Sequence, residues 1–273
     1  MSRPVTINGS QPRAGQPPGS NPLGLNQTSP APASGLPLVT PSVQPPTSET
    51  APIFIRDILA QGVERLPPNP DGINITNLVR VATIRDNSSM LHALANGLYL
   101  NYRQGTLTDG TVIKQSEWIK TLRQDLAMYL SEPHPSSQPS AKVTYYETLT
   151  NPGHTQEQMK RLLESDAEIG IDFLEYVAEF LRADVYVIDL TTMQPFDLRL
   201  NGETEINYSK YIKGRTSVII GALRHVTNEN NRQIVRTHFE SIGVEIKIGE
   251  YPLAFKSNGM LIQQLQKLLG LIN

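Results

Sequence analysis

The sequence predicts an α+β domain whose sheet is completed late in the chain. Apolar residues recur at helical spacing through the first half of the folded region, and runs with strand character follow only from residue 184 onward. A proline-rich stretch precedes both. Residues 1–52 hold 12 of the 21 prolines, no aromatic residue and three charges. Such a stretch buries too little apolar surface to offset the entropy of ordering it, which predicts a disordered tail.

The boundary between tail and domain is expected near residue 52, which gives a folded domain over residues 53–273. The tail is interpreted as a flexible tether. The alternative is a docking arm for a proline-recognising partner, with Gln44-Pro45-Pro46 as its densest piece. No P-x-x-P spacing and no flanking basic anchor support that alternative, so the tether is preferred.

The elements of the domain follow in order. A short helix-like pattern runs from Ile53 to Leu66, and an extended segment covers 77–84. Helices are predicted over 89–102, 116–130, 155–164, 170–182 and 261–272. Strands are predicted over 184–188, 217–223 and 237–242. The segment Val244–Ile248 either pairs with the third strand across Gly243 or continues it.

Composition excludes several classes of function. Lys and Arg number 24 against 26 Asp and Glu, and this net charge of −2 leaves no electrostatic footprint for nucleic acid or an anionic membrane. No apolar run reaches the ~18–20 residues that a membrane-spanning helix needs. The first residues lack the apolar core of a secretory signal peptide. An intracellular protein is expected, in the cytoplasm, or in the host cytoplasm or the virion if it is viral.

Cysteine is absent, which excludes disulfides and thiolate metal sites. The five histidines show no zinc-binding spacing, so neither a metal nor another cofactor is expected. His92 is expected on a helix flank, and the three histidines outside the motifs described below are expected to be solvated.

The segment Asp86–Leu94 carries the most information. A polar turn, Asp-Asn-Ser-Ser, runs into an apolar helical pattern in which Ala93 and Gly97 keep one side slim. Ser or Asp before an apolar helix is typical of an N-cap. A residue at that point has backbone N–H groups directed at it and lies at the positive end of the helix dipole, a field that lowers the pKa of a thiol.

This segment resembles the signature of the ovarian-tumour (OTU) family of papain-like deubiquitinating cysteine proteases, roughly Asp-Gly-Asn/Ser-Cys-Leu-Phe-x-Ala-Leu. Asp86, Ser88, Ala93 and Leu94 match it, whereas Asn87 replaces the usual Gly and Ser89 occupies the position of the catalytic Cys. The resemblance implies a small mixed or antiparallel sheet packed between helices. Taken alone, the same residues also fit an ordinary capped amphipathic helix.

A second segment, Thr237–Ile242, resembles the last strand of the same family, which begins with a His followed by an aromatic residue. His238 and Phe239 match that pattern. His238 and Glu240 project to the same side of a strand, since side chains alternate with period two. The family usually has Asn or Asp where Glu240 stands, so Asp86 is the other carboxylate considered for orienting His238.

The resemblance implies a site in which a Cys at position 89 attacks the carbonyl at the C-terminus of ubiquitin or of a ubiquitin-like protein. His238 acts as the base, Glu240 or Asp86 orients it, and backbone N–H groups of Asn87 and Ser89 hold the oxyanion. With Ser at position 89 the activity is expected to be near background.

Three hypotheses remain open. The chain is a deubiquitinase carrying an engineered Cys→Ser substitution, a natural OTU-like pseudoenzyme that retains ubiquitin binding, or a structural protein, for example a viral one, that has lost ubiquitin altogether. Ubiquitin or a ubiquitin-like protein is the expected partner, and the sequence leaves the oligomeric state open.

Overall fold

The structure, a computed structural model, describes residues 62–107, 109–135, 142–150, 152–198, 206–207, 212, 214–229 and 232–272. The predicted tail and most of the helix-like segment from Ile53 lie outside the described residues. The domain boundary at residue 52 therefore stays a prediction.

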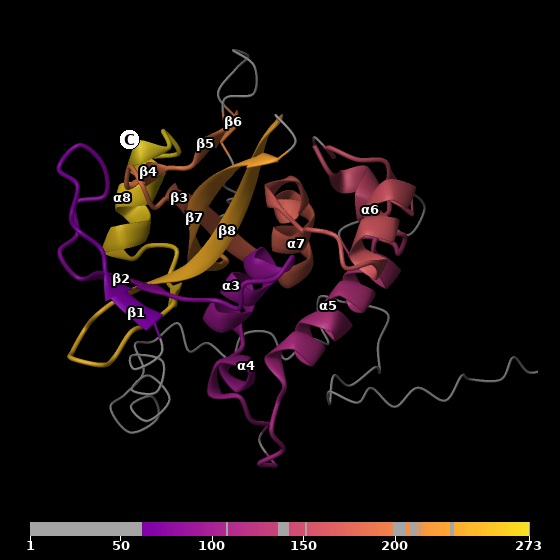
Figure 1. The fold of residues 1–273 in the computed structure, drawn as a ribbon, viewed down its shortest axis with the longest axis horizontal. Coiled ribbons are helices and arrows are strands. Elements are labelled where there is room, and N and C mark those ends of the chain that lie inside the picture. The colour runs from indigo at the N-terminus through magenta and orange to yellow at the C-terminus, as the bar shows by residue number, and fades with distance from the viewer. Residues whose placement is uncertain are drawn as a thin grey trace, which may run out of the picture.

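A mixed sheet forms the centre of the molecule, between helices (Figure 1). Its strands follow the order β1 (Val63–Arg65), β2 (Leu78–Val81), β8 (Arg232–Val244), β7 (Thr216–Glu229), β3 (Ala183–Asp189) and β4 (Gln194–Pro195), and β9 (Ala254–Phe255) pairs with β7. β3 and β7 are parallel and the other pairs are antiparallel. β5 (Asp197–Leu198) and β6 (Ile206–Asn207) form a separate two-stranded sheet. The predicted α+β class with a mixed sheet between helices is confirmed.

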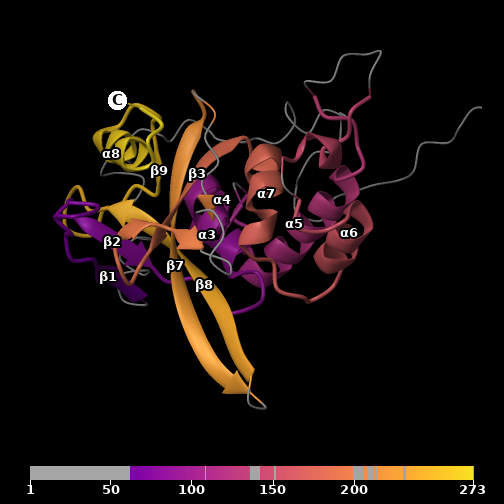
Figure 2. The same ribbon diagram turned by 90° about the horizontal axis from the view of Figure 1, so that it is seen from above.

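Helices cover both faces of this sheet. On one side lie α3 (Ser89–Leu98), α4 (Leu100–Gln104), α5 (Gln115–Tyr129), α6 (Gln156–Glu164) and α7 (Leu174–Leu181), together with two 3₁₀ turns, Tyr146–Thr148 and Ile171–Phe173. α3 packs directly on β7 and β8, whereas α5 and α6 pack on each other farther from the sheet. α8 (Met260–Leu268) lies on the other side (Figure 2).

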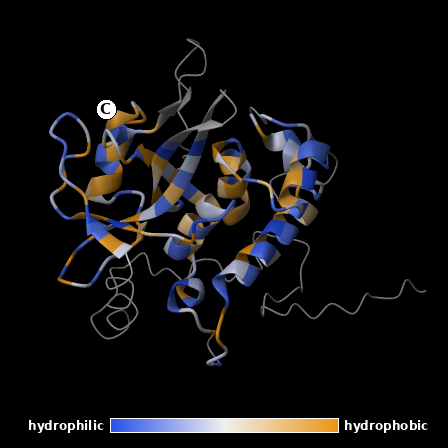
Figure 3. Ribbon diagram, in the orientation of Figure 1, coloured by the Kyte–Doolittle hydropathy of each residue, from blue (hydrophilic) through white to orange (hydrophobic). Residues whose placement is uncertain are grey.

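The alternation of side chains along β3 explains the two cores. Val185 and Val187 join the apolar cluster under α3, α5 and α7, whereas Tyr186 and Ile188 join the cluster under α8. A strand buried on both faces reads as a continuous apolar run, which is how β3 appears in the sequence. In Figure 3 the hydrophobic residues gather on α3, α7 and β3, where these layers meet.

Several predicted elements differ from the structure. Val63–Arg65, expected at the end of a helix-like pattern, form strand β1, which pairs with β2. The helix expected over residues 89–102 is interrupted at Tyr99, which is extended (φ −115°, ψ 108°) and whose ring centroid lies 4.7 Å from that of Trp118, with the two rings tilted by 60°. The segment after Val244 neither pairs with β8 nor continues it. The chain turns instead, with Gly249 at φ +85° and the Ile246 N–H donating to the Glu250 carbonyl at 3.1 Å.

The hairpin of β7 and β8 is longer than predicted. Eleven residue pairs join the two strands, from Ile219 with Ile242 to Glu229 with Arg232. Its outer part extends beyond the rest of the sheet (Figure 2). Polar residues dominate that part, so it lacks the apolar alternation that predicted the inner strands.

Candidate functional site

Position 89 is the first residue of α3. Ser88 is the N-cap, but its hydroxyl makes no capping hydrogen bond and instead accepts one from Arg123 Nη1 at 2.8 Å. The Asp86 carboxylate fixes the turn, since its Oδ1 accepts from the Ser88 N–H at 2.7 Å. A carboxylate that accepts from the backbone N–H two residues later stabilises a turn. Such a bond is unfavourable inside a helix and favourable just before one, so it marks the start of α3.

Arg123 links the turn before α3 to the end of α6 and the segment that follows it. Arg123 is 6 % exposed, and its guanidinium donates to the Ser88 hydroxyl and to the carbonyl oxygens of Leu162, Leu163, Ser165 and Ala167. Burial lowers the pKa of Arg123, and nearby carboxylates, Asp166 and Asp86, act against that. The guanidinium stays charged and places a cation beside the start of α3.

Asn87, one of the two predicted oxyanion-hole residues, is attached to the same segment. Its side-chain Nδ2 donates to the Asp166 carbonyl at 2.7 Å, and its own carbonyl accepts from the Ile169 N–H at 2.8 Å. Asn87 therefore has a structural reason to stand where the related signature has Gly. Whether the backbone N–H groups of Asn87 and Ser89 hold an oxyanion stays a prediction.

Ser89 lies against β8, the strand that carries His238. Its hydroxyl is buried and accepts from the Phe239 N–H at 3.2 Å. Four residues along α3, the Ala93 carbonyl accepts from Ser241 Oγ at 3.0 Å. The close approach of helix and sheet depends on Gly97, because a Cβ there would lie 2.2 Å from Val218 Cγ1. The slim side predicted from Ala93 and Gly97 is the side that meets the sheet.

His238 is one residue from that contact and is mostly buried. Its Nε2 lies 3.4 Å from Thr83 Oγ1 and 3.9 Å from Glu240 Oε1. Burial lowers the pKa of His238, and the nearby cations and imidazoles of Arg85, His225 and His92 lower it further, whereas Asp86 raises it. The structure thus brings Asp86 within electrostatic range of His238.

Glu240 shares a face with His238, as its spacing on the strand requires, but its carboxylate is also paired elsewhere. Arg80 Nη1 lies 3.3 Å from Glu240 Oε2, and Arg80 also contacts Glu64. The 3.9 Å separation between Glu240 Oε1 and His238 Nε2 is too long for a hydrogen bond. The side chain lies in the place expected of an orienting group without making the orienting bond.

Asp86 makes its close imidazole contact with His92. Oδ2 of Asp86 lies 2.9 Å from His92 Nε2, and His92 Nδ1 is hydrogen-bonded to the Tyr102 hydroxyl. His92 is fully buried, so its expected position on a helix flank was wrong. The overlooked signal is that Ser89–Leu98 contains no Asp, Glu, Lys or Arg, which is typical of a helix buried on all sides.

A groove of about 640 Å³ borders this region. Thr83, which lies beside His238, and Tyr102, which bonds His92, both line it. Ile84 and Val112 contribute partly exposed apolar side chains to its wall, at 39 % and 75 % exposure. From α3 the groove takes Asn96, near the C-terminal end of that helix, and Thr83 is the lining residue that contacts His238.

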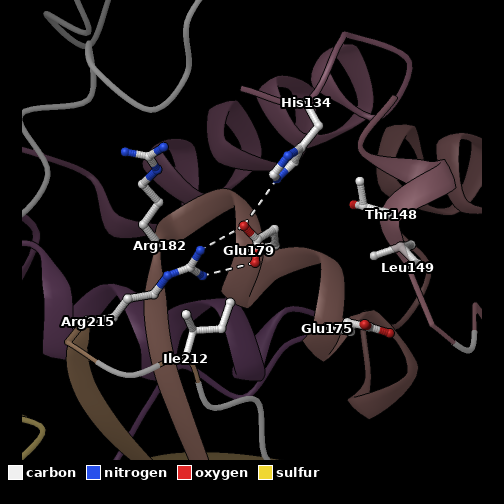
Figure 4. A pocket seen from close by; sticks show the side chains of 8 residues that line it. All are labelled: His134, Thr148, Leu149, Glu175, Glu179, Arg182, Ile212 and Arg215. Carbon is white, nitrogen blue, oxygen red and sulfur yellow. Dashed lines mark hydrogen bonds and ion pairs between the residues drawn. The ribbon is translucent and has the colours of Figure 1, made fainter. Parts of the chain in front are cut away.

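A second pocket, of about 330 Å³, lies at the C-terminal end of α7 (Figure 4). Glu179 is at its centre, bonded to His134 Nε2 at 3.1 Å and to both Nη atoms of Arg215 at 3.0 and 2.8 Å. The expectation that His134 is solvated was wrong, because its side chain is only 11 % exposed.

Within the described residues no group of three or more His, Asp or Glu side chains is placed to hold a metal ion. In the same part of the chain, every helix is too short or too polar to cross a bilayer.

Comparisons with known proteins add one remote likeness. No family model matches the sequence, and no curated protein matches it. Among solved structures, the chain is similar to an ovarian-tumour (OTU) domain determined in complex with ubiquitin. The two are 13 % identical with a TM-score of 0.35, over 71 % of this chain and 84 % of that one. A likeness at this level assigns neither family nor function.

Proposed function

We propose that the chain carries an OTU-like deubiquitinase site in a form that lacks the thiol nucleophile, and that this site binds the C-terminus of ubiquitin or of a ubiquitin-like protein. The observation that supports the proposal is the hydrogen bond between Ser89 Oγ and the Phe239 N–H. This bond joins the start of α3 to the residue that follows His238, so the two motif segments, 150 positions apart, meet in space.

The surroundings of position 89 suit a thiolate better than a hydroxyl. The site combines the N-terminal end of α3, the Arg123 guanidinium beside Ser88, and the Phe239 N–H. Each favours negative charge on the side-chain atom at position 89. A serine hydroxyl ionises far less readily than a thiol, so these groups do little for Ser89 itself.

The bonding around His238 is compatible with a base. Thr83 Oγ1 lies 2.5 Å from the Phe239 carbonyl and donates its proton there. Thr83 Oγ1 can then only accept from His238, which favours the tautomer with the proton on Nε2. Nδ1 is left with its lone pair and is the nitrogen we assign to proton abstraction. Glu240, on the Nε2 side, stabilises the imidazolium by charge across 3.9 Å.

A natural pseudoenzyme is the second candidate, and one observation favours it. Ser89 is 5 % exposed and satisfies a buried backbone N–H, which is a structural role that needs no catalysis. In that case the natural chain binds ubiquitin without cleaving it, and the groove serves recognition alone.

The test is the variant Ser89→Cys in the full chain. We expect it to form a covalent adduct with ubiquitin that carries a C-terminal electrophile, and to cleave di-ubiquitin, whereas the Ser89 chain does neither. Loss of a triad nucleophile costs on the order of 10⁶ in kcat, so the contrast is large. Adduct formation is read by gel shift and intact mass.

Two controls make the result specific. The double variant Ser89→Cys/His238→Ala is expected to lose ~100-fold or more of the reaction rate, because a positioned base contributes that much. Binding of unmodified ubiquitin to the Ser89 chain is measured in parallel. A folded Ser89→Cys protein that stays inert but binds ubiquitin supports the pseudoenzyme, and one that does neither contradicts both proposals.

A further inference from the structure

We propose that His92 is a positioning residue of this site, which holds the Asp86 carboxylate in place through the chain of contacts Asp86–His92–Tyr102. This inference rests on the proposed function. It assigns a role to a fully buried histidine that lies outside the predicted catalytic set.

The contacts span three elements of the chain. Asp86 is in the turn before α3, His92 is on the first turns of α3, and Tyr102 is on α4. His92 Nε2 lies 2.9 Å from Asp86 Oδ2, and Nδ1 is bonded to the Tyr102 hydroxyl. His92 is 0 % exposed and Tyr102 is 1 % exposed, so the bond between them is shielded from water, whereas the Asp86 end of the chain of contacts is partly exposed.

Near neutral pH only one arrangement of protons allows the Asp86 carboxylate, the His92 imidazole and the Tyr102 hydroxyl to make these hydrogen bonds. Burial lowers the pKa of His92, against the opposing effect of Asp86, so the ring is neutral. Burial, and after it the Asp86 charge, raises the pKa of Tyr102, which therefore keeps its proton. A carboxylate only accepts, so Nε2 carries the ring proton and donates to Asp86, and the Tyr102 O–H donates to Nδ1.

This arrangement leaves the second carboxylate oxygen directed at the turn. Asp86 Oδ1 accepts from the Ser88 N–H at 2.7 Å while Oδ2 is held by His92. The Asp86 side chain is 38 % exposed, and without His92 it has room to rotate into solvent or toward Arg85. His92 thus holds Asp86 in place, and Asp86 in turn holds the backbone of Ser88, immediately before position 89.

The same contact keeps a negative charge near His238 without bonding to it. Asp86 raises the pKa of His238 against burial and against Arg85, His225 and His92. A Cys–His ion pair requires a protonated His238, so the position of Asp86 affects how readily a thiol at position 89 ionises. The other charged groups around that position are Arg123, beside Ser88, and Glu240, beside His238.

The experiment uses the full chain with Ser89→Cys, in which the introduced thiol is the sole one because this sequence contains no cysteine. Alkylation by iodoacetamide is measured against pH, which reports thiol ionisation without ubiquitin. His92→Leu, His92→Gln and Tyr102→Phe are added singly. The Gln amide nitrogen can stand in for Nε2 and donate to Asp86, whereas Leu cannot.

We expect His92→Leu to leave at least tenfold less thiolate at pH 6.5, Tyr102→Phe to change it in the same direction by a smaller factor, and His92→Gln to restore most of it. Thermal unfolding of each variant is recorded alongside. A histidine that only fills the core would lower the melting temperature and leave the alkylation profile unchanged, and that result would overturn the proposal.

If His92→Leu does not fold, the decision passes to the two milder variants. Less thiolate in Tyr102→Phe, with His92→Gln close to the parent, supports the proposal, and an alkylation profile in Tyr102→Phe equal to that of the parent overturns it. Ubiquitin reactivity is scored separately. A shifted alkylation profile in a protein that never reacts with the ubiquitin electrophile keeps His92 as a positioning residue and rejects the ubiquitin proposal.

Discussion

Two histidine–carboxylate pairs in this molecule have nearly the same geometry and very different surroundings. His92 meets Asp86 at 2.9 Å beside position 89, and His134 meets Glu179 at 3.1 Å in the pocket of Figure 4. Arg215 occupies both oxygens of Glu179, so the charge of that carboxylate is neutralised where it stands. Asp86 is shared between an imidazole and a backbone N–H, and its charge still acts on His238.

The difference lies in the third partner. In the cluster of Glu179, Arg215 and His134, the guanidinium binds both carboxylate oxygens through its two Nη atoms. We call this a closed cluster, and it links α7 to the segments that carry Arg215 and His134. In the Asp86–His92 pair the third partner is a backbone N–H instead of a guanidinium. That bond fixes the turn before α3, and within the described residues the negative charge of Asp86 is not neutralised by a cation bound to it. A histidine–carboxylate contact therefore says little about function until the remaining lone pairs are assigned.

Breaking the closed cluster gives the largest expected effect. Glu179→Ala leaves Arg215 and His134 without their shared carboxylate, and their side chains are only 20 % and 11 % exposed. Removing one partner of a buried pair costs ~3 kcal/mol or more of unfolding free energy. Urea unfolding measures it. Alkylation of the thiol in Ser89→Cys should be unchanged, and a stability loss below ~1 kcal/mol would show that the cluster is not closed.

A third carboxylate, that of Asp184, pairs with neither a histidine nor an arginine in the described part of the chain, and it can be compared with Asp86 and Glu179. Asp184 is fully buried, its Oδ1 accepts from the Ile212 N–H at 2.7 Å, and within the described part of the chain no partner is found for its Oδ2 or for the neighbouring Ser217 Oγ. Burial raises the pKa of Asp184 to about 6.

We therefore expect Asp184→Asn to stabilise the protein. A raised pKa means that the folded state binds the proton more tightly than the unfolded state, so the ionised Asp184 destabilises the fold above pH 6, by ~3 kcal/mol at pH 7. The gain should shrink as pH falls through 6 toward 4. Thermal unfolding at pH 7.5 and pH 4.5 measures it, and an equal or negative effect at both values would refute the assignment.

The smallest expected effects are in the pH dependence of the two pairs. The pKa of His92 is lowered mainly by burial, so its stabilising contribution is present above ~6.5 and is lost as pH falls below that value. For Glu179 burial acts upward, but bonds from Arg215 and His134 prevail and lower the pKa. Its contribution is therefore present above 4.5 and is lost as pH falls below that value.

The unfolding free energy of the wild type minus that of each variant, measured from pH 8 to 3, isolates these contributions. As the pH falls, the difference for His92→Gln should begin to decline near pH 6.5, and the difference for Glu179→Gln only below pH 4.5. His238, whose pKa is also lowered, remains in both variants and cancels. Coincident pH windows would mean that the two pairs are not distinct.

The sequence predicted the elements better than the contacts between them. Helix α5 was expected at 116–130 and spans Gln115–Tyr129, since its apolar stripe is set by local spacing. The break at Tyr99 was missed because the local spacing of apolar residues continues through it, whereas the Tyr99 ring contacts Trp118 on another helix. Hairpin length was missed because strand pairing, not hydropathy, holds its outer part together.

The same distinction applies to the candidate site. Both motif segments were found from the sequence, and the structure brings Ser89 against the residue after His238. The partner of Asp86 was not found, because a histidine six positions away reads as a surface residue until the whole helix is seen to be buried. The catalytic roles of Ser89, His238 and Glu240 stay predictions that the variants above address.

The long hairpin has a consequence for how the chain tolerates insertions and deletions. Removing a single residue from the outer part of β8 would shift its inner part by one position against β7, and His238 and Phe239 would exchange faces of the sheet. Removing one residue from each strand preserves the pairing and leaves both faces intact. The outer part of the hairpin can therefore lengthen or shorten by matched steps in the two strands, while an unmatched step would replace the residue that contacts Ser89.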